Sequence, residues 1–268
     1  TGAPVCGDKV TNMWGAYRRC VRLTAPPVCG NNVTMMGLAY DSCYNITGFP
    51  VCGDNVTSMY YSYANCYNLT GVPVCGNNVG TMAYTYMNCY NLKGSPVCGE
   101  NVYTMLYTYY GCRNLTGSPI CGNNVLDISY AYAACENIGR NAYFYSNNIA
   151  FVTGCFALKN NSKRLDIYVH NGSATHANIC VNDAQSLVAE NITYTNTGTC
   201  QYNTAYNIYI YPVANVAAVY KEHMLLKLQD FEYTTNSGGI MTLTGWKGTT
   251  NGIESTELII PDYDRIEL

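Results

Sequence analysis

The feature that most constrains the fold is a 23-residue repeat, which occurs six times in succession over roughly the first half of this 268-residue chain. One copy reads PVCGDNVTSMYYSYANCYNLTG, over residues 50–71. Two cysteines recur in every copy: Cys6, Cys29, Cys52, Cys75, Cys98, Cys121 and Cys20, Cys43, Cys66, Cys89, Cys112, Cys135. A valine and a tyrosine recur likewise: Val10, Val33, Val56, Val79, Val102, Val125 and Tyr17, Tyr40, Tyr63, Tyr86, Tyr109, Tyr132. Because self-similarity at this period marks stacked structural units, the repeat predicts a solenoid.

The apolar positions inside one copy predict a short helix. The recurring side chains Val56, Met59, Ser62, Tyr63, Cys66 and Leu69 follow one another at spacings of 3, 3, 1, 3 and 3. Such spacing places them on one face of a helix of about three turns. The residue before the recurring tyrosine is always Ala, Ser or Thr, and we expect this small side chain to let the helix approach its neighbour.

The stretch that follows predicts a short strand. Leu69 and Val74 are Leu or Ile and Val or Ile in their columns, with a recurring Pro between them that cannot donate a backbone hydrogen bond. We therefore expect a parallel strand of about three residues, ending at a glycine turn with Asn or Asp after it. A further asparagine column is Asn45, Asn68, Asn91, Asn114 and Asn137. Its side chains either bond backbone groups of adjacent repeats or are simple turn residues.

The run Val-Thr-x-Met-x-x-x-Tyr-x-x-Cys-x-Asn-Leu-Thr resembles the repeats of BspA-like leucine-rich-repeat surface proteins. Those repeats carry a V-x-x-(I/M)-x-x-A-(F/Y)-x-x-C-x-x-L core, and the likeness covers residues 4–139. The chain departs from that family where Gly-x-Pro-Val-Cys-Gly replaces a more hydrophobic strand. The resemblance implies an extracellular, cell-surface or virion-surface protein that binds or adheres, as in gut bacteria and their phages.

The fold class expected is α/β: a leucine-rich-repeat-like solenoid of short helices and short parallel strands, with a β-rich C-terminal cap. We assign residues 1–139 to the six-copy solenoid, 140–216 to degenerate repeats with a β-rich cap, and 217–268 to a helix plus a small β-unit. The alternating runs 165–169 and 206–213 predict strands, and we favour an extension of the solenoid sheet over a separate unit. Residues 219–231 predict a helix, 231–246 a hairpin and 256–261 a third strand. This tail also resembles the β-unit attached to BspA-like repeats.

Composition excludes several classes of partner. Only 12% of residues are charged and the net charge is −3, so the chain has no excess of positive charge with which to bind nucleic acid. No apolar run reaches the ~20 residues of a membrane span, so we expect no membrane insertion. The chain begins inside a repeat, and we therefore expect a fragment or processed form.

The 15 cysteines leave two alternatives open. Regular pairs favour one disulfide per repeat, such as Cys66 to Cys75, whereas free Cys is among the most buried residue types and a column of buried thiols fits equally. No Cys or His cluster has the spacing of zinc ligands, so we expect no metal.

Glycosylation sequons follow from the repeat itself, and their use depends on a eukaryotic host. They lie at Asn32, Asn45, Asn55, Asn68, Asn114, Asn160, Asn171 and Asn191.

Nothing in the sequence assembles a catalytic constellation. His170, His176 and His223 stand outside any metalloprotease motif, and no nucleophile elbow is present. We therefore expect no enzyme and no cofactor, and we interpret the histidines as surface or strand residues.

The candidate ligand-binding residues are tyrosines on the variable side of the repeats. One column holds Tyr61, Tyr84, Tyr107 and Tyr130, and another holds Tyr44, Tyr67 and Tyr90. Tyrosine offers a large contact area at low entropic cost, so these columns predict recognition of a host-surface glycan or protein. The alternatives are tyrosines that merely cover the flank of a structural spacer or fibre segment, and a homo-oligomer or filament. The structural core is expected at Val79, Met82, Tyr86, Cys89 and Leu92.

Overall fold

The computed structural model describes residues 6–25, 29–150, 154–156, 164–170, 179–182, 189–192, 201–203, 208–224, 231–235, 241–246, 249–250 and 253–254. The chain divides into two compact units, Thr1–Ala214 and Asn215–Leu268. The finer division at residues 139 and 216 stays a prediction.

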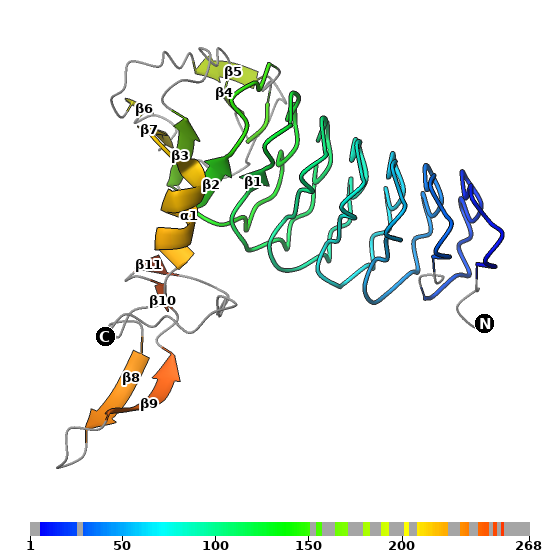
Figure 1. Cartoon of the computed structure of the whole chain (residues 1–268), viewed down its shortest axis with the longest axis horizontal. Coiled ribbons are helices and arrows are strands. Elements are labelled where there is room, and N and C mark those ends of the chain that lie inside the picture. The colour runs from blue at the N-terminus through cyan, green and yellow to red at the C-terminus, as the bar shows by residue number, and fades with distance from the viewer. Residues whose placement is uncertain are drawn as a thin grey trace. The chain divides into compact units, whose positions relative to one another are not determined.

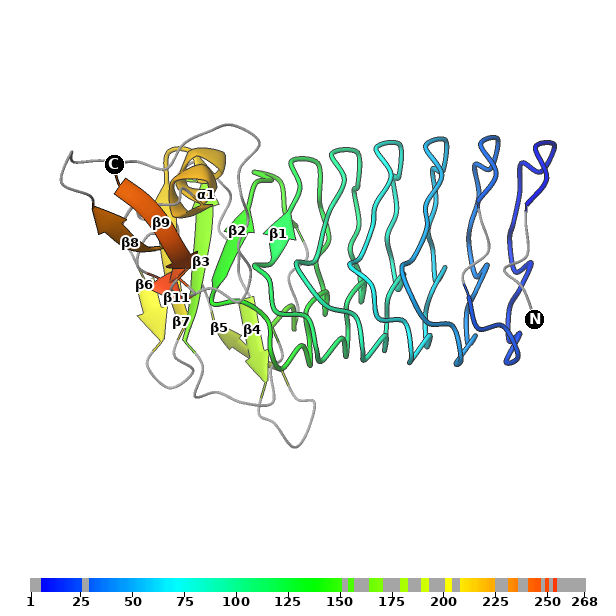
Figure 2. The same ribbon diagram turned by 90° about the horizontal axis from the view of Figure 1, so that it is seen from below.

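Successive repeats lie side by side, as Figures 1 and 2 show for the blue to green part of the chain. We number them by their first cysteine: repeat 1 begins at Cys6, repeat 2 at Cys29, and so on to repeat 6 at Cys121. A single parallel bridge joins each repeat to the next. The bridged pairs are Asn12 and Met35, Met35 and Ser58, Ser58 and Thr81, Thr81 and Thr104, Thr104 and Asp127.

The predicted helix is wrong, because the segment forms a run of turns in every described repeat. In repeat 3 the N–H groups of Met59 and Tyr61 donate to carbonyls of repeat 4, each at 3.0 Å. Those of Ser62 and Ala64 donate instead to the residue three positions earlier, at 2.9 and 3.2 Å. Every second N–H group of this segment donates to a carbonyl of the next repeat. It is therefore not available for the hydrogen bond to the residue four positions earlier that an α-helix requires. The apolar face was nevertheless placed correctly, because Val56, Met59, Tyr63 and Cys66 are all fully buried.

The strand predicted in each repeat forms at one place only within the described residues. β1 (Ile120–Cys121) pairs in parallel with β2 (Asn141–Phe144). In the earlier repeats a tyrosine hydroxyl takes the place of the missing neighbour strand. The Tyr63 hydroxyl donates to the carbonyl of Val51 at 2.8 Å and accepts from its N–H at 2.9 Å. Tyr86 bonds Val74 in the same way, at 2.7 and 3.1 Å.

The sheet continues beyond the repeats and thereby confirms the extension predicted from the two alternating runs. β3 (Leu165–His170) pairs in parallel with β2, and β7 (Ile208–Val213) pairs in parallel with β3. β6 (Gln201–Asn203) joins β7 antiparallel, which gives the order β1-β2-β3-β7-β6. β4 (Ile179–Asn182) and β5 (Ala189–Ile192) form a separate antiparallel pair.

The second unit contains one described helix and two hairpin pairs. α1 (Val216–Met224) begins three residues before the predicted start, where the Asn215 side chain accepts a hydrogen bond from the N–H of Ala218 at 3.0 Å. β8 (Phe231–Thr235) and β9 (Met241–Trp246) pair antiparallel and confirm the predicted hairpin. β10 (Thr249–Thr250) pairs with β11 (Ile253–Glu254). The strand predicted at 256–261 lies outside the described residues, and among the described helices none is long and apolar enough to cross a membrane.

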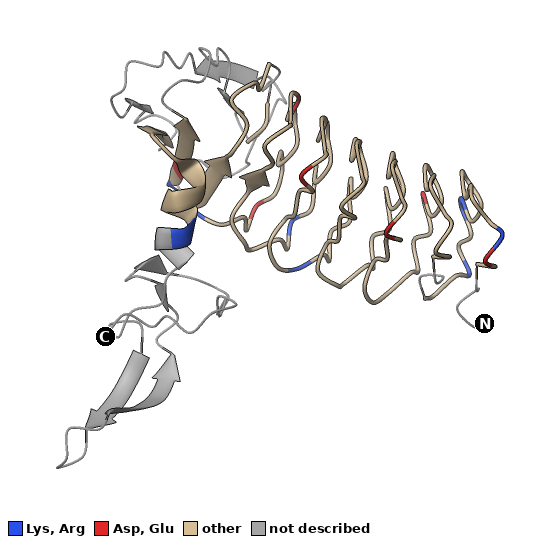
Figure 3. Cartoon of the chain, viewed as in Figure 1, with Lys and Arg blue, Asp and Glu red and all other residues tan. Residues whose placement is uncertain are grey.

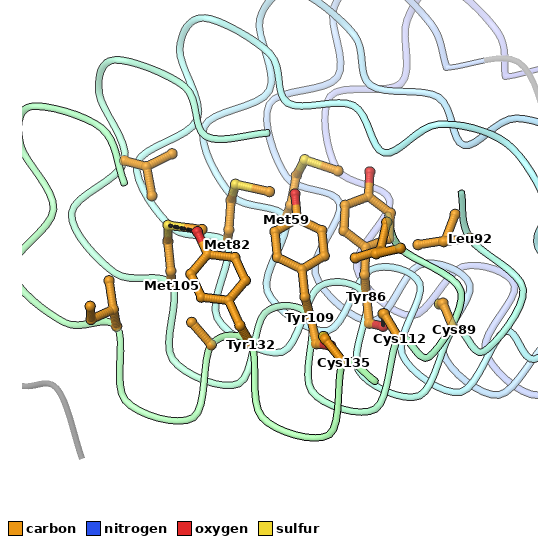
Figure 4. Packing of buried hydrophobic residues seen from close by; sticks show 14 of the residues in the cluster. Met59, Met82, Tyr86, Cys89, Leu92, Met105, Tyr109, Cys112, Tyr132 and Cys135 are labelled. Carbon is orange, nitrogen blue, oxygen red and sulfur yellow. Dashed lines mark hydrogen bonds between the residues drawn. The ribbon is translucent and has the colours of Figure 1, made fainter. Parts of the chain in front are cut away.

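The core runs through the repeats as columns of identical side chains, drawn for repeats 3 to 6 in Figure 4. Val79, Met82, Tyr86, Cys89 and Leu92 are all fully buried. Beyond repeat 6, Ile149, Cys155 and Phe156 are buried as well, and the Cys155 carbonyl accepts from the N–H of Tyr132 at 2.9 Å. The core therefore continues through a degenerate seventh repeat and on into the buried side chains of β3 and β7.

Candidate functional site

A stack of tyrosines, most of them fully buried, runs through the centre of the repeats. The rings of Tyr17, Tyr40, Tyr63, Tyr86, Tyr109, Tyr132 and Phe156 follow one another with centroids 4.9 to 5.9 Å apart. Burial raises the pKa of Tyr63 and Tyr86 well above its usual value, so these phenols remain neutral hydrogen-bonding groups. The last ring, Phe156, has no hydroxyl, whereas the Tyr132 hydroxyl donates to the Ile120 carbonyl at 2.8 Å even though Ile120 also pairs with β2.

The cysteines are structural thiols. The 13 cysteines from Cys6 to Cys155 are all free, so the alternative of one disulfide per repeat is not realised among them. The Cys66 thiol donates to the carbonyl of Tyr40 at 3.1 Å, and that of Cys89 donates to the carbonyl of Tyr63 at 3.0 Å. Burial is the main reason why the pKa of Cys52 and of Cys75 rises to about 12. Since the thiolate is the reactive form, these groups are poor nucleophiles and poor metal ligands at neutral pH.

Hydroxyl and amide side chains connect adjacent repeats at three further columns. The Thr85 hydroxyl donates to the Met59 carbonyl at 2.7 Å, so the small residue before the tyrosine serves as a hydrogen-bond donor in addition to being small. The Asn68 amide donates to the Tyr44 carbonyl at 3.0 Å, which realises the inter-repeat alternative for that column. A second asparagine column, predicted as turn residues, bonds the same way: the Asn78 amide donates to the Asp54 carbonyl at 2.8 Å.

The structure brings the first set of candidate ligand-binding tyrosines together. We call Tyr61, Tyr84, Tyr107 and Tyr130 the outer tyrosine strip. Their ring centroids are 4.3, 5.1 and 4.6 Å apart along the strip, with interplanar angles of 13°, 6° and 15°. Face-to-face stacking covers the ring faces with neighbouring rings, so the half-buried strip presents ring edges and hydroxyl groups. Burial first, and the neighbouring Tyr84 second, raise the pKa of Tyr61 to about 12, so its hydroxyl stays protonated at neutral pH.

The backbone under the outer tyrosine strip is left-handed. The φ angles of Tyr61, Tyr84, Tyr107 and Tyr130 are 53°, 58°, 52° and 53°. Glycine occupies the equivalent position in repeat 1, at Gly15, and in the degenerate repeat, at Gly154, with φ of 66° and 61°. A left-handed conformation costs a non-glycine residue roughly 1–2 kcal/mol. The strip therefore holds tyrosine at a position where the backbone favours glycine.

The second tyrosine column lies on a different line of the surface. The rings of Tyr44, Tyr67 and Tyr90 are stacked with centroids 5.0 Å apart at both steps. The column continues with the Arg113 guanidinium, whose carbon lies 5.0 Å from the Tyr90 centroid, and with Glu136, whose carboxylate is 3.7 Å from Arg113 Nε. This column therefore ends in a cation, Arg113, and an anion, Glu136. The outer tyrosine strip contains only tyrosines.

Sequence reasoning missed an ion-pair cluster on the sheet. The Asp166 carboxylate is 3% exposed and accepts from Nε of Arg140 at 2.6 Å and from Nε of Arg164 at 2.7 Å. Arg164 also lies over the Tyr209 ring at 4.0 Å and donates to the Tyr211 hydroxyl at 2.8 Å. The sequence held one sign of this cluster: Leu165, Ile167 and Val169 alternate along a strand, which places Asp166 on the opposite face. Two guanidinium groups neutralise the charge of the buried carboxylate, and we interpret the cluster as a structural ion pair that connects neighbouring strands.

Catalytic chemistry finds no support in the described part of the chain. His170 lies in β3, while the side chains of His176 and His223 are outside the described set. Within the described residues, no group of three His, Cys, Asp or Glu side chains is arranged to hold a metal ion. No family model, curated protein sequence or solved structure matches this chain.

Proposed function

We propose that this chain is a non-enzymatic binding module, built as a solenoid, that recognises an extended ligand along the outer tyrosine strip. The likeness of its repeats to BspA-like surface proteins supports an extracellular, cell-surface or virion-surface location. The ligand proposed is a glycan or a protein on a host surface.

The observation that carries this proposal is the use of tyrosine at four consecutive left-handed positions. Packing alone does not require it, because Gly15, Leu38 and Gly154 stand at the same position in other repeats, all with positive φ. Ring stacking recovers only about 0.5–1.5 kcal/mol per pair, which is comparable to the backbone cost. A residue that brings little net stability at four sites, and that presents its polar edge outward, is best explained by binding.

The chemistry of the strip fits a ligand that is long and rich in hydroxyl groups. Each neutral phenol can both donate and accept a hydrogen bond. The stacked rings repeat this group once per repeat, at 4.3 to 5.1 Å. Between residues 42 and 92 the only charged side chain is Asp54, so recognition by Tyr61 and Tyr84 would rely on hydrogen bonds and shape.

The test replaces Tyr61, Tyr84, Tyr107 and Tyr130 together by Asn, which tolerates the left-handed conformation. We expect the quadruple variant to keep the melting temperature of the parent within a few degrees and to lose binding on an array of defined neutral and acidic glycans and on intact host cells. Tyr103→Asn is the matched control, because Tyr103 is 51% exposed and lies outside the strip. Equal binding by the parent and the quadruple variant would refute the strip as the site.

The dense bonding between repeats favours one second candidate, a rigid spacer. Backbone, thiol, hydroxyl and amide groups all bond from one repeat to the next. A rod held in this way can carry another domain away from a surface without binding anything itself. Failure of the parent protein to bind any glycan or cell in the test above would favour the spacer.

A further inference from the structure

We propose that repeat 1 holds the terminal subsite of this binding surface, in which an acidic sugar residue of an extended glycan stacks on Trp14 and occupies the space over Gly15. The inference rests on the proposed function and names both a place on the surface and a ligand class.

Trp14 is an aromatic ring with a face left for a ligand. Its indole stacks on the Tyr60 ring at 6.0 Å and 15°, and it reaches across Gly37, where an added Cβ would come within 2.3 Å of the indole. The Asn12 side chain holds the segment by accepting from the Trp14 N–H at 2.8 Å. One face of the indole is thus covered, yet the side chain is 49% exposed. In the outer tyrosine strip, by contrast, neighbouring rings cover the faces.

The space over Gly15 is the position that Leu38 fills in repeat 2 and that tyrosine rings fill in repeats 3 to 6. An added Cβ at Gly15 meets no atom within 4 Å. In repeat 3 the ring at the corresponding position, Tyr61, lies 4.7 Å from the ring of Tyr60, which corresponds to Trp14. In repeat 5 the corresponding ring, Tyr107, lies 5.4 Å from Tyr110, which corresponds to Arg18. By analogy with these later repeats, a ring that occupied the space over Gly15 would contact Trp14 on one side and Arg18 on the other.

Charge at this end of the repeats favours an anionic ligand. The described part of repeat 1 contains Lys9, Arg18, Arg19 and Arg22 against a single acidic residue, Asp8. Residues 29–150 contain three basic side chains, Lys93, Arg113 and Arg140, against five acidic ones, Asp41, Asp54, Glu100, Asp127 and Glu136. Figure 3 shows this concentration of Lys and Arg in the first repeat.

The arginines of repeat 1 are arranged to leave donors for a ligand. Arg18 Nε bonds the nearly buried Asp41 carboxylate at 2.9 Å, which fixes the guanidinium while 46% of the side chain stays exposed. Arg19 and Arg22 make no ion pair with any residue in the described ranges and are exposed. Arg19 also has a left-handed backbone, with φ of 59°.

An acidic pyranose combines the features that this subsite requires. Its apolar C–H face can stack on indole, its carboxylate or sulfate can pair with guanidinium groups, and its remaining hydroxyls continue onto the phenol edges. A polynucleotide fits less well, because each of its units carries a phosphate, and the residues from 42 to 92 contain no cation to meet those charges.

The experiment uses the full chain with Trp246→Phe, so that Trp14 is the only indole of the two in the sequence. Oligogalacturonate is titrated while Trp14 fluorescence is followed, beside the same oligosaccharide with methyl-esterified carboxyls. We expect a saturable fluorescence change, binding about tenfold weaker for the ester, and further weakening with added salt.

Two substitutions of Gly15 test the position. Gly15→Tyr supplies the ring that later repeats carry, and Gly15→Asn fills the space with a side chain that tolerates the left-handed backbone. We expect each to weaken oligogalacturonate binding about tenfold or more. Gly7→Ala is the matched control in the same repeat, since a Cβ there also meets nothing within 4 Å and binding should be unchanged.

The outcomes separate this inference from the proposed function. Undiminished binding in both Gly15 variants, or equal affinity for the acid and its ester, would overturn the subsite. The proposed function would still stand if the quadruple tyrosine variant lost binding on the glycan array. Tighter binding of a single-stranded oligonucleotide than of oligogalacturonate would replace the sugar by a nucleotide and also overturn the inference.

Discussion

Replacing Tyr86 by Phe tests the most unusual bond of the structure. The Tyr86 hydroxyl donates to the Val74 carbonyl at 2.7 Å and accepts from the Val74 N–H at 3.1 Å, from a fully buried ring (Figure 4). Tyr86→Phe removes one oxygen atom and leaves ring stacking intact. It deprives two backbone groups of their partner, each of which costs about 1–3 kcal/mol when left unpaired.

Partial access of water to Val74 reduces this cost, since that residue is only half-buried. We therefore expect a loss of roughly 2–4 kcal/mol in the free energy of unfolding. The measurement is urea unfolding followed by circular dichroism, with the m-value unchanged. The control is Tyr103→Phe, which should stay within about 0.5 kcal/mol because Tyr103 is 51% exposed.

A change below about 0.5 kcal/mol in Tyr86→Phe would contradict the reasoning, because it would mean that the hydroxyl does not substitute for a strand neighbour. Tyr63→Phe offers an independent repetition, since its hydroxyl bonds Val51 at 2.8 and 2.9 Å.

Met82→Asp should destabilise by roughly 3–5 kcal/mol, because it leaves an unpaired charge in a fully buried site, whereas Leu126→Asp, at a side chain 44% exposed, should be nearly neutral in the same urea assay. Thr85→Val should cost about 1–2 kcal/mol through loss of its 2.7 Å bond to the Met59 carbonyl, and Thr85→Ser should retain most of the stability; equal losses in both would contradict the role of the hydroxyl. Stability should also fall as pH rises from about 9 to about 12, because the Cys52 and Cys75 thiols ionise near 9.0 when unfolded but only near 12 when folded, so that unfolding releases protons. Each such thiol contributes a slope of about 1.4 kcal/mol per pH unit, and a Cys52→Ala, Cys75→Ala variant measured at several pH values should show a shallower fall.

The buried columns could be predicted from the sequence, because identical residues at a fixed period report identical environments. Val79, Met82 and Cys89 were found in this way, as was the stacking of the tyrosines within their two columns. The backbone could not be predicted, because a run of turns with every fourth residue left-handed places side chains on one face much as a helix does. Tyr61 and Asn65 both have positive φ, and the signal in their columns was limited to the glycines Gly15 and Gly111 and to the asparagines Asn65 and Asn88.

The strand prediction failed for a different reason. Pro73 and Val74 have the composition of an edge strand, and the hydrogen-bond partner of Val74 is the Tyr86 side chain rather than another strand. No rule based on backbone pairing anticipates a tyrosine hydroxyl at that place. The site residues could be grouped into columns from sequence alone, but which ring faces are covered and which stay open, at Trp14 above all, required the structure.

The bonds between repeats all connect a position in one repeat to a fixed position in the next. The Thr85 hydroxyl reaches the Met59 carbonyl 26 residues away, and the Asn68 amide reaches the Tyr44 carbonyl 24 residues away. Deleting or duplicating 23 residues in register would therefore exchange these backbone partners for ones of the same kind, whereas the ion pair of Arg18 with Asp41 has no counterpart in the later repeats. Gain or loss of one of repeats 3 to 6 would thus lengthen or shorten the stack of repeats and add or remove one tyrosine of the outer tyrosine strip. The number of repeats in the gene would in this way set the length of the strip.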